Sequence, residues 1–451
     1  MPDSVKTSTI GLVAALSIGI GGMIGAGIFS VLGVVAHLSG SALPLSFAIG
    51  GVVAGLAAYS YVTLGKTFPS IGGSVTFLVR GYGEGILSGS LSLFQYFSFI
   101  ITIALYATGF AVYASTFIHL PTKVWAASVV LIFTVINFLG SRVMGRAESV
   151  IVIIKLTILG AFIVAAFAAL TSSDVSRLSP AAWPGPLDVF TGAGVVFVGY
   201  EGFGLITNAA ANMEKPKWEL PRAIYGSVAV VIIIYMMVGI RVVTNVPLGV
   251  LKGLGDSALA VAAKPSLGQA GFRLIAIAAL LSTASAVNAT LFGSTNIAYQ
   301  IAKNGGLPAA FDRKLWGRDV EGLFITSGLV LVFVFLFPLS AVASMGSAGF
   351  LLVYAAVSVG HLRIRNQTGA RGWLITASIA ACLALFSVLI YNMIRTAPSS
   401  AIALGLTLAL SFLVEVAYRH RTGRTFKTIL SQTNPSADGG WSGGWDPLGE
   451  S

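Results

Sequence analysis

The 451-residue chain has little charge, four histidines and a single cysteine. Charged residues make up 10% of it and hydrophobic residues 56%, which excludes an ordinary soluble protein. Cys382 has no second cysteine with which to form an internal disulfide, and the histidines share no metal-binding spacing. No nucleophile–base pair stands out at membrane depth either, so we expect no metal, no cofactor and no enzyme.

Long apolar stretches fill most of the chain. They reach twenty or more residues without strand-like alternation, which predicts membrane-spanning helices rather than a barrel. The predicted fold class is therefore an all-α polytopic membrane protein with twelve transmembrane helices. The twelve ranges are 10–35, 41–65, 86–118, 123–141, 148–171, 187–212, 222–246, 270–302, 322–338, 340–361, 373–392 and 399–418.

The positive charge follows the predicted topology. Basic residues outnumber acidic ones, 27 to 16, for a net charge of +11. With the N-terminus in the cytoplasm, most lysines and arginines fall on inner segments, as the positive-inside rule requires. Topology and contact with the lipid bilayer explain the charge, so no nucleic-acid partner is expected. We predict a multi-pass cell-membrane protein with cytoplasmic N- and C-termini, in which a transmembrane domain (1–420) precedes a disordered cytoplasmic tail (421–451).

Two spans are interrupted by glycines. Leu16–Phe29 carries five glycines within nine positions, and the sixth span contains Phe197-Val-Gly-Tyr-Glu-Gly-Phe-Gly204. One interpretation is a helix that opens onto a cavity, where free peptide groups bind a charged small molecule. The other is a close helix–helix contact, as Gly21-x-x-x-Gly25 would allow. The matching places of the two stretches predict an inverted repeat of 10–171 and 187–361, followed by two accessory helices in 373–418.

Several ordered motifs make the chain recognisable. They are Gly21-Gly-Met-Ile-Gly-Ala-Gly-Ile-Phe29, Tyr200-Glu-Gly-Phe203, Asn212-Met-Glu-Lys-Pro216, Leu220-Pro-Arg-Ala-Ile224, Leu281-Ser-Thr-Ala-Ser-Ala-Val-Asn288 and Ala302-Lys-Asn-Gly-Gly-Leu-Pro308. Together they resemble the amino acid–polyamine–organocation (APC) superfamily of transporters, of the prokaryotic amino acid permease type. The resemblance implies a LeuT-like five-plus-five inverted repeat with helices 1 and 6 broken, and alternating access. It implies an amino acid or a related amine as the substrate.

An amino acid zwitterion needs partners for both of its charges in a low-dielectric site. Amides at the start of an outer half of the broken first helix would hold the carboxylate, because a helix N-terminus offers free donors. Carbonyls of the first and sixth spans would accept from the ammonium, and by resemblance these are the backbone contacts of the family. The predicted binding residues are Ile20, Met23, Ile24, Gly25, Ala26, Gly27, Tyr106, Phe197, Val198, Tyr200, Glu201, Phe203 and Gly204.

Glu201 has two interpretations. A carboxylate at mid-span is costly and points to a functional role, as a partner for a cationic substrate or as a proton carrier. It could instead bond backbone amides freed by the helix break. Because this set holds no other charge, we predict a neutral amino acid as the substrate. The alternatives are a polyamine or cationic amino acid carrier that uses Glu201, and an amino acid sensor built on the transporter fold.

Lys155 lies inside the fifth span and is the predicted coupling residue. Its ammonium could occupy a cation site near the first-span carbonyls, with Ser282, Thr283 and Ser285 of the eighth span. Relatives with a lysine at this position resemble proton-coupled or uncoupled carriers, so we predict proton symport. The alternative is a side chain that reaches back to the lipid headgroups. A monomer or a homodimer is expected.

Overall fold

The computed structural model describes residues 10–70, 72–139, 144–168, 176–247, 257–303 and 321–422. Within these segments the chain is helical, apart from connecting loops and one isolated β-bridge between Ile10 and Met213. Of the predicted C-terminal tail, only its first two residues fall among those described, and the side chain of Ala26 also lies outside the description.

The described segments contain both long helices and short helical turns. In chain order they are α1 (Leu12–Ser39), η1 (Gly40–Ala42), α2 (Leu43–Thr67), α3 (Gly73–Tyr82), α4 (Ile86–Ala114), α5 (Thr122–Leu139), α6 (Met144–Ala168), η3 (Ser176–Leu178), η4 (Pro180–Ala182), α8 (Pro186–Val196), η5 (Phe197–Tyr200), α9 (Phe203–Asn208), η6 (Ala210–Asn212), α10 (Pro216–Asn245), α12 (Ala258–Lys303), α13 (Glu321–Leu336), α14 (Leu339–Arg363), α15 (Arg365–Thr368), α16 (Gly372–Thr396) and α17 (Pro398–Thr422).

Every predicted span overlaps a helix, or in the sixth case an interrupted helix. Nine stretches of the described chain are long and apolar enough to cross a membrane, and one of them, Leu12–Thr67, contains both α1 and α2. Two shorter apolar helices, Val150–Ala165 and Gly322–Leu336, add to these. The chain is thus a multi-pass, all-α membrane protein, and the number of twelve spans stays a prediction.

The two predicted helix breaks have different outcomes. The break in the first span is wrong, because α1 is one continuous α-helix from Leu12 to Ser39. A glycine inside a helix costs only about 1 kcal/mol relative to alanine, which packing can override. The break in the sixth span is present: α8 ends at Val196, a 3-10 turn follows, and α9 begins at Phe203.

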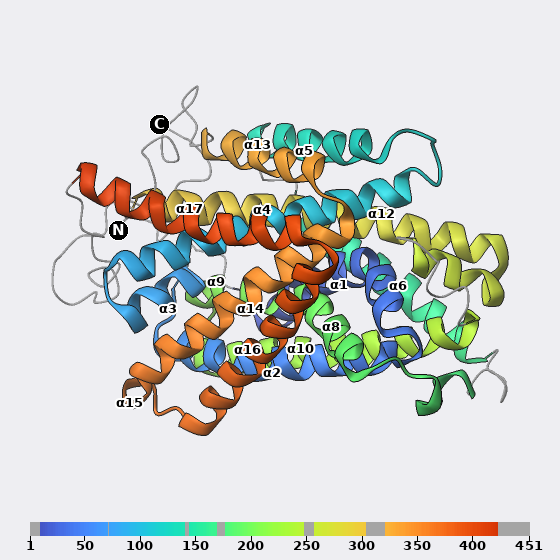
Figure 1. Cartoon of the computed structure of the whole chain (residues 1–451), viewed down its shortest axis with the longest axis horizontal. Coiled ribbons are helices and arrows are strands. Elements are labelled where there is room, and N and C mark those ends of the chain that lie inside the picture. The colour runs from blue at the N-terminus through green and yellow to red at the C-terminus, as the bar shows by residue number, and fades with distance from the viewer. Residues whose placement is uncertain are drawn as a thin grey trace, which may run out of the picture.

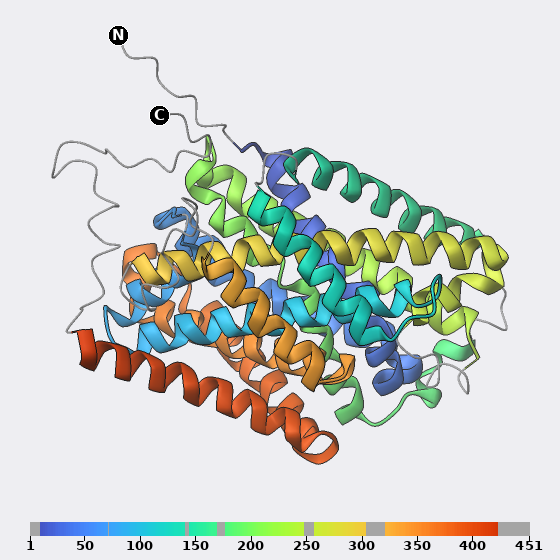
Figure 2. The same ribbon diagram turned by 90° about the horizontal axis from the view of Figure 1, so that it is seen from above.

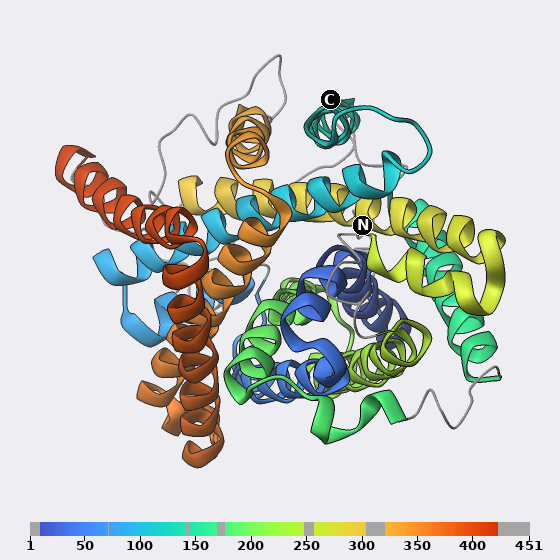
Figure 3. The same cartoon turned by 45° about the vertical axis from the view of Figure 1, so that its right-hand side comes forward.

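Helix α1 lies at the centre of the bundle. It packs against α10, α8 and α12, and also against α9, η5 and α4. Figure 3 shows α1 enclosed by the segments drawn in green and blue that form α2, α8 and α10. Both helix α1 and the interrupted span therefore lie where neighbouring side chains can reach their peptide groups.

Helix α12 is the longest element and contains one bend. Gly268 has φ +62° and ψ −156°, a backbone conformation that side chains other than hydrogen rarely tolerate. The bend separates a short first part of the helix from a longer second part. This second part corresponds to the predicted span of 270–302. That second part crosses the bundle beside α4, as Figure 1 shows.

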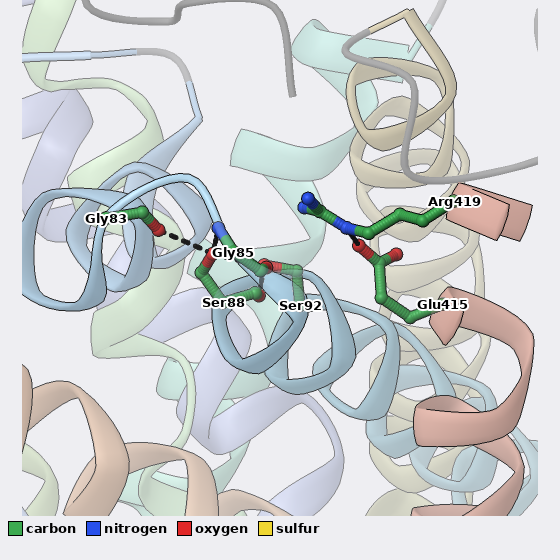
Figure 4. Close-up of polar contacts among 6 residues, drawn as sticks. All are labelled: Gly83, Gly85, Ser88, Ser92, Glu415 and Arg419. Carbon is green, nitrogen blue, oxygen red and sulfur yellow. Dashed lines mark hydrogen bonds and ion pairs between the residues drawn. The ribbon is translucent and has the colours of Figure 1, made fainter. Parts of the chain in front are cut away.

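The last two helices pack on the outside of the bundle. Helix α16 contacts α14, α2 and α8, whereas α17 contacts α4, α16 and α14. Figure 2 shows α17 along one edge of the molecule. Glu415 of α17 is 1% exposed, and its Oε1 accepts from Arg419 Nε at 2.5 Å (Figure 4). This carboxylate lies directly against Gly89, near the start of α4.

The contact at Gly89 leaves no room for a side chain. A Cβ atom there would lie 2.2 Å from Glu415 Oε1 and 2.3 Å from its Cδ. Gly89→Ala should therefore push the carboxylate out of its ion pair and lower the thermal unfolding midpoint, at a cost of about 1–3 kcal/mol. Differential scanning fluorimetry in detergent measures the change.

Gly405→Ala is the matched control, because a Cβ at Gly405 of α17 would meet nothing within 4 Å. We expect its midpoint to stay at or above that of the wild type. Equal midpoints for Gly89→Ala and Gly405→Ala would contradict the close contact between α17 and α4.

Candidate functional site

The centre of the molecule is a close contact between α1 and the interrupted sixth span. A Cβ atom at Gly27 would lie 2.5 Å from Gly199 Cα, and one at Gly202 would lie 2.5 Å from the Met23 nitrogen. Glycine is required here because the two backbones touch. These glycines differ from the Gly21-x-x-x-Gly25 pair for which a close helix–helix contact was predicted. Gly25, by contrast, faces α12 and α6, where its Cβ would meet Ala286 and Lys155.

Hydroxyl groups from neighbouring helices bind the peptide groups at this contact. Tyr235 of α10 donates to the Met23 carbonyl at 2.6 Å and approaches the Gly199 carbonyl at 3.2 Å. Tyr354 of α14 donates to the Glu201 carbonyl at 3.2 Å. Both tyrosines are buried. Carbonyls of both spans at this contact therefore accept from side chains of neighbouring helices, and that of Glu201 also accepts from the Gly204 amide at 2.9 Å.

Ser347 of α14 performs a similar role at the end of α8. Its hydroxyl accepts from the Val198 amide at 3.0 Å and donates to the Gly194 carbonyl. Sequence reasoning missed this serine, Tyr235 and Tyr354. The available signal was the presence of hydroxyl-bearing residues in the middle of otherwise apolar spans.

The amides predicted to bind the substrate carboxylate do not lie at the start of a helix, as we expected. Because α1 is continuous, Gly25, Ala26 and Gly27 lie inside a helix and not at the start of one. Their amides are therefore part of the helical ladder in this conformation. The expected array of free donors would require α1 to open locally.

The predicted side chains of the site are buried and gather around aromatic rings. Met23, Ile24, Tyr106, Phe197, Val198, Tyr200, Glu201 and Phe203 are each at most 3% exposed, and Ile20 is half-buried. The rings of Phe197 and Phe203 lie 5.6 Å and 5.1 Å from that of Tyr354. Tyr61 of α2 joins this cluster through Phe203 at 5.5 Å.

Tyr200 points away from this cluster. Its hydroxyl donates to the Phe47 carbonyl of α2 at 2.8 Å, and its ring lies 5.2 Å from that of Tyr235. It packs the sixth span against α2 and α10, and its role in substrate binding stays a prediction.

Glu201 is 3% exposed and carries the buried carboxylate of the site. Oε1 would lie 3.7 Å from a Cβ placed on Gly204, and that position is also 3.1 Å from the Tyr354 hydroxyl oxygen. In the part of the chain that the structure describes, no backbone amide donates to this carboxylate. The interpretation in which Glu201 caps freed amides therefore has no contact to support it.

Lys155 reaches the first span. It is fully buried, and its Nζ donates to the Gly21 carbonyl of α1 at 2.7 Å. Ser282 of α12 donates to the Ile24 carbonyl at 3.2 Å, one turn further along the same helix. Lys155 and Ser282 thus meet on α1, and the ammonium does not reach the headgroups.

The other two predicted coupling residues are less directly placed. Thr283 donates to the Ala279 carbonyl of its own helix at 2.7 Å. Ser285 is 5% exposed on the same helix. Of the predicted coupling residues, Lys155 and Ser282 thus bind carbonyls of α1.

Comparison with known proteins agrees with this architecture. The amino acid permease family profile matches residues 10–443. An uncharacterized protein of Methanocaldococcus jannaschii is 40% identical over 94% of this chain and 99% of its own. The inner membrane transport protein YbaT of Escherichia coli is 35% identical, over 80% of this chain and 85% of its own. The branched-chain amino acid permease BcaP of Lactococcus lactis is 24% identical, over 78% and 81%. The chain belongs to the amino acid permease family of the APC superfamily, whose members are transporters and not enzymes.

Proposed function

We propose that this permease moves a neutral amino acid across the cytoplasmic membrane by alternating access, as a proton symporter. The observation that carries the proposal is the contact between Lys155 Nζ and the Gly21 carbonyl, beside the interrupted sixth span. A transporter needs a buried site on mobile backbone and a group that responds to the coupling ion. We assign these two roles to the interrupted sixth span and to Lys155 of α6, which come from different parts of the chain.

The helix packing supports an inverted repeat of two five-span halves. If the halves are related, the first-half helices α1, α2, α4, α5 and α6 correspond to α8, α10, α12, α13 and α14. The contact of α1 with α10 then corresponds to the contact of α8 with α2, which is also present. The contact of α6 with α12 becomes that of α14 with α4, and that of α5 with α4 becomes that of α13 with α12. Each of these pairs packs directly, as two related halves require.

The aromatic cluster supports a neutral side chain on the substrate. The cluster consists of the buried rings of Phe197, Phe203, Tyr61 and Tyr354. None of these four residues carries a charge, and Glu201 is the one carboxylate among the predicted binding residues. A neutral zwitterion would place its ammonium near carbonyls of the interrupted span and its side chain among the rings. The name of the Lactococcus relative, a branched-chain amino acid permease, is in line with this chemistry.

Uptake by proteoliposomes tests the proposed transport. We expect labelled alanine to accumulate when the outside is more acidic than the inside. Unlabelled neutral amino acids should compete, whereas lysine and putrescine should not. Binding without uptake would instead identify an amino acid sensor.

Competition by lysine or putrescine would favour the alternative, a carrier of polyamines or cationic amino acids that uses Glu201. In that case Glu201→Gln should abolish the competition by the cations and leave alanine uptake in place. Glu84→Gln, a variant of the loop before α4, is the matched control for loss of a carboxylate.

Lys155 generates the prediction on coupling. Under the proposed coupling, the ammonium that binds the Gly21 carbonyl releases its proton during the cycle. Lys155→Ala should lose accumulation driven by a pH gradient and retain binding of the substrate, measured as thermal stabilisation. Lys123→Ala, at the exposed start of α5, serves as the control. Accumulation at the wild-type level in Lys155→Ala would remove Lys155 from the mechanism.

Under the proposed alternating access, α1 and the sixth span move relative to each other. Their contact is made by the backbone of glycine residues, so an added side chain should hinder this movement. In Gly27→Ala the new methyl would lie 2.3 Å from the Tyr235 hydroxyl and 2.5 Å from Gly199 Cα. We expect it to wedge the helices apart, with a cost of about 1–3 kcal/mol in stability and a lower rate of uptake. Gly55→Ala of α2, where a Cβ meets nothing within 4 Å, should behave as the wild type. Normal uptake by Gly27→Ala would contradict the close contact.

A further inference from the structure

Two lysines line a pocket at one end of the bundle, away from the proposed substrate site. Lys66 and Thr67 belong to the last turn of α2, and Lys217 to the first turn of α10. These helices pack against each other along their length. The pocket between their ends has a volume of about 330 Å³, roughly that of ten water molecules in the liquid.

Neither lysine has an acidic partner. Within the described segments, no carboxylate lies at ion-pair distance from Lys66 or Lys217. Glu219 of α10 is 8% exposed, and its Oε2 accepts from the Lys215 amide at 3.1 Å, where it caps the helix. Two ammonium groups on one concave wall repel each other, and an anion between them would relieve that repulsion.

Thr67 lines the pocket, but its hydroxyl proton is not available to a ligand. Its hydroxyl already donates to the Thr63 carbonyl at 2.9 Å. The charge of the pocket therefore comes from the two ammonium groups, which bind phosphate oxygens as point charges.

The lipid-exposed face of α10 begins at the same pocket. Trp218, Tyr225, Val230 and Ile233 are 49%, 39%, 40% and 57% exposed, and their spacing places them along one side of the helix. From Trp218 to Ile233 this face is about 22 Å long, at 1.5 Å per residue. Tryptophan and tyrosine are the side chains that favour the level of the lipid headgroups. Arg222 stacks on Trp218 at 3.7 Å and adds a third positive charge beside them.

We propose that Lys66 and Lys217 bind the phosphate of an anionic phospholipid, whose acyl chains lie along the exposed face of α10. A free anion would use only the pocket, whereas an amphiphile uses both the charged pocket and the apolar face that continues from it. Basic pockets between membrane helices are suited to such headgroups. The bound lipid would link the end of α2 to the start of α10.

Lipid titration of the purified full-length protein in neutral detergent tests the proposal. Phosphatidylglycerol and phosphatidylcholine with identical acyl chains are compared by thermal unfolding and by native mass spectrometry. We expect the wild type to bind phosphatidylglycerol about tenfold more tightly than phosphatidylcholine, from the attraction of two lysines. The Lys66→Gln/Lys217→Gln variant should lose this preference.

The matched control is Arg365→Gln/Arg371→Gln, which removes two positive charges elsewhere, at α15 and the start of α16. It should keep the preference for phosphatidylglycerol. Where the double lysine variant does not fold, Lys217→Gln alone, an exposed change, should reduce the preference by about threefold.

Three results would overturn the proposal. The first is a double lysine variant that still prefers phosphatidylglycerol. The second is an equal loss in the arginine control, which would indicate general surface charge. The third is stabilisation by inorganic phosphate or glycerol 3-phosphate equal to that by phosphatidylglycerol, which would identify the pocket as a site for a soluble anion.

Discussion

A peptide group in the middle of a membrane finds no water, so each carbonyl at the centre of this bundle needs a donor from the protein. Backbone amides supply most of these donors, and hydroxyl and ammonium groups of neighbouring helices add to them. Tyr235 binds the Met23 and Gly199 carbonyls together, and Lys155 binds that of Gly21. Because each donor acts at one depth, a shift of α1 against the sixth span requires several bonds to be exchanged at once. A bound ammonium could replace some of them, which links occupancy of the site to movement of the helices.

Glycine has two separate uses at this contact. In the sixth span, glycines flank a true interruption between α8 and α9. In α1 they leave the helix intact and let another backbone approach, as at Gly22, where a Cβ would lie 3.3 Å from Gly202 Cα. Glycine thus accompanies a helix break in the sixth span, whereas in α1 it allows close approach of another backbone without a break. Opening of α1 would have to be induced, since its hydrogen-bond ladder is complete in this conformation.

Hydropathy was sufficient to predict where the helices lie, because lipid-length apolar runs have few alternatives. Resemblance brought Lys155 close to the first-span carbonyls, and that contact is present. The sequence alone does not show which glycine-rich stretch interrupts its helix. The glycines lower the helix propensity of both stretches by a similar amount, so tertiary packing decides the outcome. Nor could the sequence identify Tyr235 and Tyr354 as donors, because one span does not reveal which neighbour its tyrosine faces. The ion pair of Glu415 and Arg419 was missed too, although their spacing of four residues on one helix is typical of such pairs.

Under the proposed inverted repeat, the two halves hold their first spans in comparable ways but with different chemistry. Lys155, from the fifth span of the first half, donates to the Gly21 carbonyl, and Tyr354, from the fifth span of the second, donates to that of Glu201. Gly21 and Glu201 each precede a glycine, and those two glycines face each other. The lysine donor is a charged ammonium group, whereas the tyrosine donor is a neutral hydroxyl. Under the proposed proton coupling, deprotonation would weaken the hold on α1 and leave the sixth span fixed. The direction of that asymmetry makes α1 the helix that responds to the proton.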